Sequence, residues 1–171
     1  MKKSIKRTNE LSAILKKGNN DSIIQAVASL RDDEPFDGAI GMLVSFYDKC
    51  ADKHILKTIE DFFNDIKDKS ARPEIMDEIK KPWKSETISM LVSSCWQSGL
   101  DYSGYITDLA RIFLGADYST AIECMTVIEE SVQKSARAVK DETIAVLMES
   151  PDAFMNEKNA LVHELISILQ R

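Results

Sequence analysis

The chain has 171 residues, of which 44% are hydrophobic and 29% are charged, and its formal net charge is −6 at pH 7. These values are typical of one soluble globular domain, and the acidic balance disfavours binding along a phosphate backbone. Six glycines and four prolines are too few for the many turns of an all-β fold, and no segment approaches the ~20 apolar residues of a membrane helix. We therefore expect a single all-α domain over residues 1–171.

Apolar residues at spacings of three and four predict ten helices, separated by Gly, Pro and acidic clusters. In chain order they cover residues 5–17, 21–30, 37–49, 52–67, a short stretch between Pro73 and Pro82, 86–97, 103–114, 119–133, 138–149 and 156–170. In the helix over residues 119–133, the predicted inward stripe is Ile122, Met125, Ile128 and Val132.

Short segments recur along the chain. ETISMLVSS at residues 86–94 returns as ETIAVLMES 56 positions later, and IGMLVS at residues 40–45 returns as ISMLVS 48 positions later. The next apolar series recurs as well, in three sets: Leu56, Ile59, Phe62, Phe63; Ile106, Leu109, Ile112, Phe113; Val162, Leu165, Ile168, Leu169. An offset shared by two consecutive helices predicts an internal triplication, and the alternative is an irregular helical bundle with coincidental matches.

The triplication predicts three units of three helices, over residues 21–67, 73–114 and 119–170. The helix over residues 5–17 stands outside them as an N-terminal cap, because a terminal repeat needs one polar outer face. The repeated stripe predicts eight buried residues: Ile59, Phe62, Leu91, Leu109, Ile112, Ile128, Leu147 and Leu165.

This pattern resembles the HEAT and armadillo group of α-solenoids, through its apolar spacings and the Glu-Thr-Ile start of two helices at Glu86 and Glu142. It is also similar to small uncharacterised bacterial proteins with HEAT-like folds. The resemblance implies an α-α superhelix whose concave surface, lined by the third helix of each unit, binds a protein or peptide partner. The repeat spacing of about 50 residues is longer than the ~40–47 that is usual for this group.

The cysteines are scattered, at Cys50, Cys95 and Cys124. An odd number of distant cysteines predicts reduced, buried thiols and a cytoplasmic protein. The basic N-terminal run lacks the apolar stretch of a secretory signal. Cys50 and His54 have a spacing of four but straddle a predicted loop, so we expect neither a metal site nor a cofactor.

Catalytic motifs are not evident. The sequence has no G-x-S-x-G turn and no glycine-rich phosphate loop. The carboxylates of residues 32–37 lie where helices end and begin, so helix capping explains them. We therefore predict a protein without catalytic residues that is not an enzyme.

A DNA-binding or repair enzyme is the alternative, because some HEAT-like proteins are DNA glycosylases with a basic groove. Here the first 17 residues carry a charge of +5 and the remainder −11, which is more typical of a basic cap on an acidic body than of a nucleic-acid groove. A permanent subunit of a larger complex is a third possibility.

Aromatic residues gather around one predicted turn, at Trp96, Tyr102, Tyr105 and Tyr118. Such residues anchor interfaces, but helices that stack on both sides bury most of their bulk. We expect Trp96 and Tyr105 to lie in the core.

The predicted partner-binding residues lie opposite the apolar stripe on the three matching helices. Thr107 of the second helix aligns there with Lys57 and His163, and Arg111 is central because its planar fork suits interface centres. A surface that is merely solvated is the alternative. The predicted binding set is Lys57, Asp61, Asp108, Arg111, His163 and Glu164.

Overall fold

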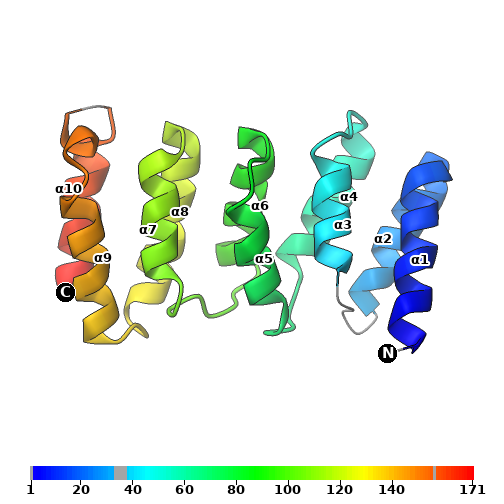
Figure 1. Cartoon of the computed structure of the whole chain (residues 1–171), viewed down its shortest axis with the longest axis horizontal. Coiled ribbons are helices and arrows are strands. Elements are labelled where there is room, and N and C mark those ends of the chain that lie inside the picture. The colour runs from blue at the N-terminus through cyan, green and yellow to red at the C-terminus, as the bar shows by residue number, and fades with distance from the viewer. Residues whose placement is uncertain (1, 33–37, 156) are drawn as a thin grey trace. The chain divides into compact units, whose positions relative to one another are not determined.

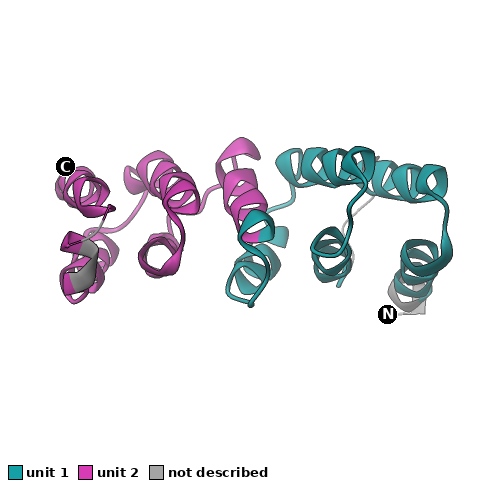
Figure 2. Ribbon diagram, turned by 90° about the horizontal axis from the view of Figure 1, so that it is seen from above, with its two compact units in different colours: residues 1–87 teal, residues 88–171 magenta. Residues whose placement is uncertain are grey.

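The computed structural model describes residues 2–32, 38–155 and 157–171, which form helices joined by loops, with no strand among them (Figure 1). The predicted all-α class is therefore confirmed. The contacts divide the chain into two compact units, residues 1–87 and residues 88–171, which Figure 2 colours separately. In the described part of the chain, no helix has the length and apolar character needed to cross a membrane.

The first unit is built from five helices. Its helix α2 packs on α4, α3 packs on α5, and α1 packs on both α2 and α3. These contacts join each helix to its sequence neighbour or to the helix two places along. The bounds are α1 Lys2–Lys17, α2 Asn20–Asp32, α3 Ala39–Tyr47, α4 Lys53–Asn64 and α5 Ala71–Ile79.

Local sequence accounts for the start of α4. The carboxylate of Asp52 accepts hydrogen bonds from the backbone N–H groups of His54 and Ile55 at 2.9 and 3.1 Å, which satisfies donors that lack a partner in the first turn. The carboxylate of Asp52 also accepts a hydrogen bond from Asn20 at 2.8 Å, so the same residue ties α4 to the start of α2.

Gly41 allows α3 to approach α5 closely. A Cβ atom at this position would lie 2.8 Å from Oε1 of Glu78, and the Gly41 N–H donates to Oε1 of Glu74 at 3.3 Å. Glu78 itself is buried and pairs with Lys81 at 2.5 Å. A side chain at residue 41 would therefore displace a buried carboxylate.

The second unit contains two antiparallel hairpins. Helix α7 packs on α8 and α9, and α10 packs on α8 and α9, so α7 and α9 form one layer and α8 and α10 form another (Figures 1 and 2). The boundary between the units falls within α6, whose residues from Ile88 onward belong to the second unit. The bounds are α6 Ser85–Gln97, α7 Ile106–Gly115, α8 Tyr118–Val132, α9 Arg137–Met148, a 3-10 turn Pro151–Phe154 and α10 Asn159–Gln170.

A buried lysine holds the start of α10 against the end of α7. The ammonium of Lys158 donates to the carbonyls of Phe113, Leu114 and Ala116 at 3.0, 2.7 and 2.9 Å. These carbonyls lie at the C-terminus of α7, where the helix dipole favours a cation. Burial lowers the pKa of this ammonium group.

The three-helix units predicted from the repeat are not confirmed, because the contacts pair the helices two by two. The offset of 56 residues equals a shift of three helices. Because successive helices of a hairpin alternate between the two layers, a shift by three helices superposes α7 of one layer on α10 of the other. The apolar spacing recurs because both layers bury a stripe of the same period.

The eight predicted core residues are buried except Ile112, which is half-buried. The buried face of α7 is centred on Ile106, Leu109, Ala110 and Phe113, so Ile112 lies at its edge.

The predicted stripe of α8 is wrong in its first half. Ile122 is 43% exposed and Met125 is half-buried. The buried face of α8 instead includes Ala121, Cys124 and Val127.

Candidate partner-binding surfaces

The predicted binding residues of the first unit form a pair on α4. The Lys57 ammonium lies 2.8 Å from the Asp61 carboxylate, one helical turn away. Both side chains lie toward solvent, and an exposed pair of this kind stabilises a helix only slightly. The pair is therefore available for contact with a partner.

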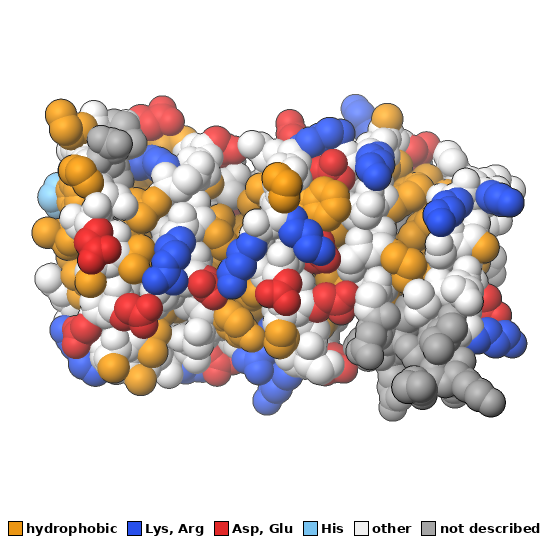
Figure 3. All heavy atoms as spheres, viewed as in Figure 1, with side chains coloured by type: hydrophobic (Ala, Val, Ile, Leu, Met, Phe, Trp, Pro, Cys, Tyr) orange, Lys and Arg blue, Asp and Glu red, His pale blue; other side chains and the backbone are white. Residues whose placement is uncertain are grey.

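In the second unit, Arg111 connects two helices. Its guanidinium lies 3.5 Å from Asp108 on α7 and 3.6 Å from Glu142 on α9. The face of Figure 3 that includes α7 and α9 shows basic and acidic side chains intermixed. Arg111 is therefore within ion-pair distance of two carboxylates.

Thr107 does not belong to this surface, so its predicted exposure is wrong. Its side chain is buried, and its hydroxyl lies 2.9 Å from that of Thr143 on α9. The Thr143 hydroxyl donates to the carbonyl of Val139 at 2.7 Å, so it accepts from Thr107. A polar residue is accommodated between α7 and α9 because it has a partner there.

The last two predicted residues, His163 and Glu164, lie on α10. The His163 ring meets Phe154 edge-on with centroids 5.4 Å apart, and Glu164 lies 3.7 Å from Arg171. Helix α10 shares a layer with α8, whereas α7 shares a layer with α9. The structure therefore brings Arg111 together with Asp108 and Glu142, and not with His163 and Glu164.

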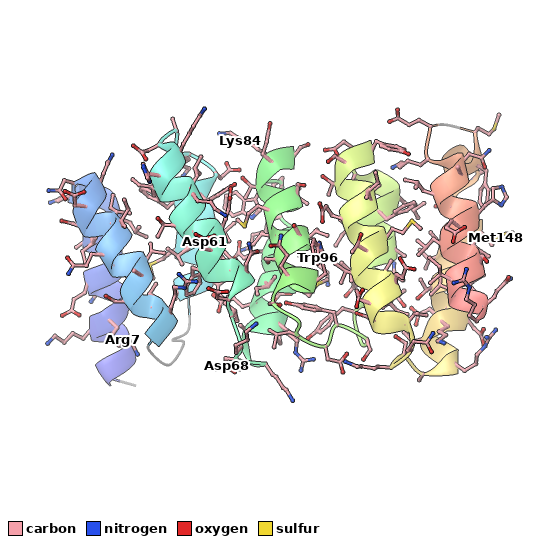
Figure 4. All side chains as sticks on the ribbon, turned by 180° about the vertical axis from the view of Figure 1, so that it is seen from behind. Arg7, Asp61, Asp68, Lys84, Trp96 and Met148 are labelled. Carbon is pink, nitrogen blue, oxygen red and sulfur yellow. The ribbon has the colours of Figure 1, made fainter. Side chains whose placement is uncertain are left out.

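The outer face of α8 is a surface that the sequence analysis missed. Tyr118 and Ile122 are 42% and 43% exposed there, and Trp96 of α6 is 41% exposed. The Trp96 indole N–H donates to Glu123 of α8 at 2.7 Å, so its ring lies between α6 and α8 (Figure 4). The prediction that Trp96 lies in the core is wrong, whereas Tyr102 is buried and Tyr105 is half-buried.

A small hollow adjoins Trp96. It has a volume of about 80 Å³ and is lined by residues of α6 and α8 together with the loops that follow these two helices. Its charged lining residues are Asp101, Glu130 and Lys134. This volume suits one side-chain terminus or a few waters.

A wider groove lies within the first unit, between α1 and α3. Its volume is about 710 Å³, in the range of small-molecule sites. Leu15, Met42 and Phe46 supply apolar walls, and Lys16 and Lys49 also line it.

Two of the three thiols are buried in the core. Burial raises the pKa of Cys95 to about 12 and also raises that of Cys124, so both stay protonated and weakly nucleophilic at neutral pH. Cys50 is half-buried, and all three cysteines are unpaired. Within residues 2–32, 38–155 and 157–171, no group of three or more His, Cys, Asp or Glu side chains is placed to hold a metal ion.

Comparisons of this chain with protein-family models, with characterised proteins and with solved structures give no match. The geometry of the two units is therefore the basis for any statement about function.

Proposed function

We propose that this chain is a non-enzymatic helical-repeat scaffold, similar to HEAT and armadillo proteins, that binds a protein or peptide partner. The main support is the contact pattern. In the first unit α2 packs on α4 and α3 on α5, and in the second unit α7 packs on α9 and α8 on α10. Contact between each helix and the one two places along is typical of stacked hairpins, which offer extended surfaces to partners.

The repeating element in this proposal is the two-helix hairpin. The sequence repeat then reflects the common need of each helix to bury one stripe, and the superhelical arrangement is part of the proposal. The unpaired thiols favour a reducing compartment, so we place the scaffold in the cytoplasm.

The ionisable groups favour a binding role over catalysis. Two thiols are held protonated by burial. The charged side chains predicted to bind a partner pair with neighbours on the surface, as Lys57 does with Asp61 and Arg111 with Asp108. Such groups suit recognition by charge more than proton transfer, which requires a shifted pKa within a cleft.

Capture from the lysate of the native cell tests the proposal. The tagged chain is cross-linked to its neighbours, and the captured protein is then produced separately and titrated against the purified chain by calorimetry. We expect saturable binding to one protein at a fixed stoichiometry. A chain that binds no protein in this titration, but binds and excises bases from damaged duplex DNA, would be the repair enzyme that was the alternative.

Arg111 provides a first test of where the partner binds. If the partner contacts the set around Arg111, the change Arg111→Glu removes a cation and introduces repulsion toward Asp108 and Glu142. Binding in the calorimetric titration would be lost while the melting temperature stays nearly unchanged, because exposed ion pairs contribute little to stability. Unchanged affinity would move the partner to another surface.

A further inference from the structure

Helix α8 is apolar on two faces. One face packs in the core through Cys124, Val127 and Ile128. Tyr118, Ile122 and Met125 follow one another at spacings of four and three on another side, exposed or half-buried. A helix that is apolar on both faces normally has a neighbour on each, and Tyr118 and Ile122 of this second stripe are 42% and 43% exposed.

Trp96 of α6 lies beside Glu123, the residue of α8 that follows Ile122. Its hydrogen bond to Glu123 holds the indole in place, so binding would not need to order this large side chain. Rigid, exposed Trp and Tyr side chains are the typical anchors of interfaces. We call Trp96, Tyr118, Ile122, Met125, Glu123 and Glu129 the α8 face.

The charge around the α8 face is mainly negative, with Lys134 as a cation at the hollow beside Trp96. Helix α8 contains Glu123, Glu129 and Glu130 and no Lys or Arg. Residues 88–171 contain six Lys and Arg against twelve Asp and Glu, so the whole formal charge of −6 lies in the second unit and residues 1–87 are neutral. A ligand for this face therefore carries positive charge.

We propose that the α8 face binds a basic amphipathic helix of a partner protein. This inference rests on the proposed scaffold function and specifies its partner. The apolar stripe from Tyr118 to Met125 extends over about 10 Å, or two helical turns. A partner helix with apolar residues at spacings of three and four would match it, with Lys and Arg beside Glu123 and Glu129.

The hollow beside Trp96 adds a specific contact. Its acidic wall includes Glu130 and Asp101, and Lys134 lines it as well. One Lys or Arg of the partner fits its volume of about 80 Å³, with the aliphatic stem on the indole ring and the charge near Glu130.

Fluorescence anisotropy with designed peptides tests this proposal. The probe is a labelled Leu/Lys peptide of about 18 residues, long enough to form a helix, with Leu at helical spacing. A scrambled peptide of identical composition and a Leu/Glu peptide of identical pattern serve as controls. We expect the patterned basic peptide to bind at least about tenfold more tightly than either control, and to weaken as salt is added.

Two variants with the same type of substitution test whether the peptide binds at the α8 face. Ile122→Lys adds a positive charge to the α8 face, and Met148→Lys makes the same change at another exposed apolar residue, at the end of α9, which is 59% exposed against 43% for Ile122. We expect Ile122→Lys to raise the Kd at least about tenfold and Met148→Lys to leave it within about twofold. Trp96→Ala gives an independent second variant, and thermal melting checks that each variant is folded.

Several results would overturn the proposal. The first is an equal Kd for the patterned and the scrambled peptide. The second is an equal change in Kd on Ile122→Lys and Met148→Lys, and the third is that no peptide binds. A dimer of the free chain that Ile122→Lys dissociates, detected by light scattering, would assign the α8 face to a second copy instead. Binding lost on Arg111→Glu but kept in Ile122→Lys would move the partner to α7 and leave the scaffold function standing.

Discussion

At the scale of single residues, Lys158 is a buried cation with three hydrogen bonds. It is nearly fully buried, and its ammonium satisfies three carbonyls at the end of α7. Lys158→Met keeps the apolar stem but leaves these carbonyls without their donor. We expect the free energy of unfolding in urea to fall by about 1.5–3 kcal/mol, the range for hydrogen bonds to charged groups. Lys134→Met, at an exposed position, is the control and should change the free energy of unfolding little. Equal effects of the two variants would show that the hydrogen bonds of Lys158 do not stabilise the fold.

Asp48 introduces a pH dependence in the first unit. Its carboxylate accepts hydrogen bonds from the Lys84 N–H at 2.9 Å and the Thr87 hydroxyl at 2.8 Å, and the hydrogen bond from the Lys84 backbone is the main cause that lowers its pKa. A lowered carboxyl pKa stabilises the folded state above the unfolded pKa, and this contribution is lost as the pH falls through the folded pKa.

Urea unfolding of the protein and of Asp48→Asn at a series of pH values measures this contribution. We expect the variant to be less stable at neutral pH. The stability difference should narrow as the pH falls below the unfolded-state carboxyl pKa of about 4 and toward the lower pKa of the folded state. A difference that stays constant down to pH 2 would contradict the lowered pKa of Asp48.

At the scale of helices, the buried hydroxyl pair of Thr107 and Thr143 tests how α7 packs on α9. Thr143 accepts from Thr107 and donates to its own helix. Thr143→Val therefore leaves the Thr107 donor unpaired, whereas Thr107→Val removes a donor and leaves a hydroxyl that still donates. An unpaired buried group costs about 1–3 kcal/mol, so Thr143→Val should destabilise more. Equal losses, or additive losses in the double variant, would mean that the two hydroxyls do not interact.

The ten helices were predictable because spacings of three and four recur through the chain. The inward face of a helix was predictable only where one face is apolar. Helix α8 carries two apolar stripes, so periodicity alone could not decide between Ile122 and Ala121 as core residues. Thr107 was predicted to face solvent because its partner, Thr143, lies 36 residues away on another helix.

The grouping of helices was harder to predict than the helices themselves. Residues 86–114 do match residues 142–170 in sequence. The match does not show which helices form hairpins, and the hairpins determine which helices contact each other. An apolar stripe shows that a helix packs against another element, but it does not show which helix that neighbour is. For the same reason the predicted binding set combines α7 and α10, which lie in different layers of the second unit.

At the scale of the whole molecule, the charge is divided unequally. The second unit carries all of the formal net charge, and five large apolar side chains that are exposed also lie in it: Trp96, Tyr118, Ile122, Met148 and Met155. The groove between α1 and α3 in the first unit has Lys16 and Lys49 among its lining residues instead. The two units therefore differ in the chemistry they offer to a partner, and a basic ligand favours the second.

Hydrogen exchange with and without the basic amphipathic peptide at saturation is the most direct test of this account. We expect slower exchange in fragments that cover α8 and the C-terminal half of α6, because a docked helix excludes solvent there and suppresses local opening, with no change in residues 1–87. Protection confined to α7 and α9, protection in the first unit, or no protection at saturation would contradict the claim that the second unit binds its partner through the α8 face.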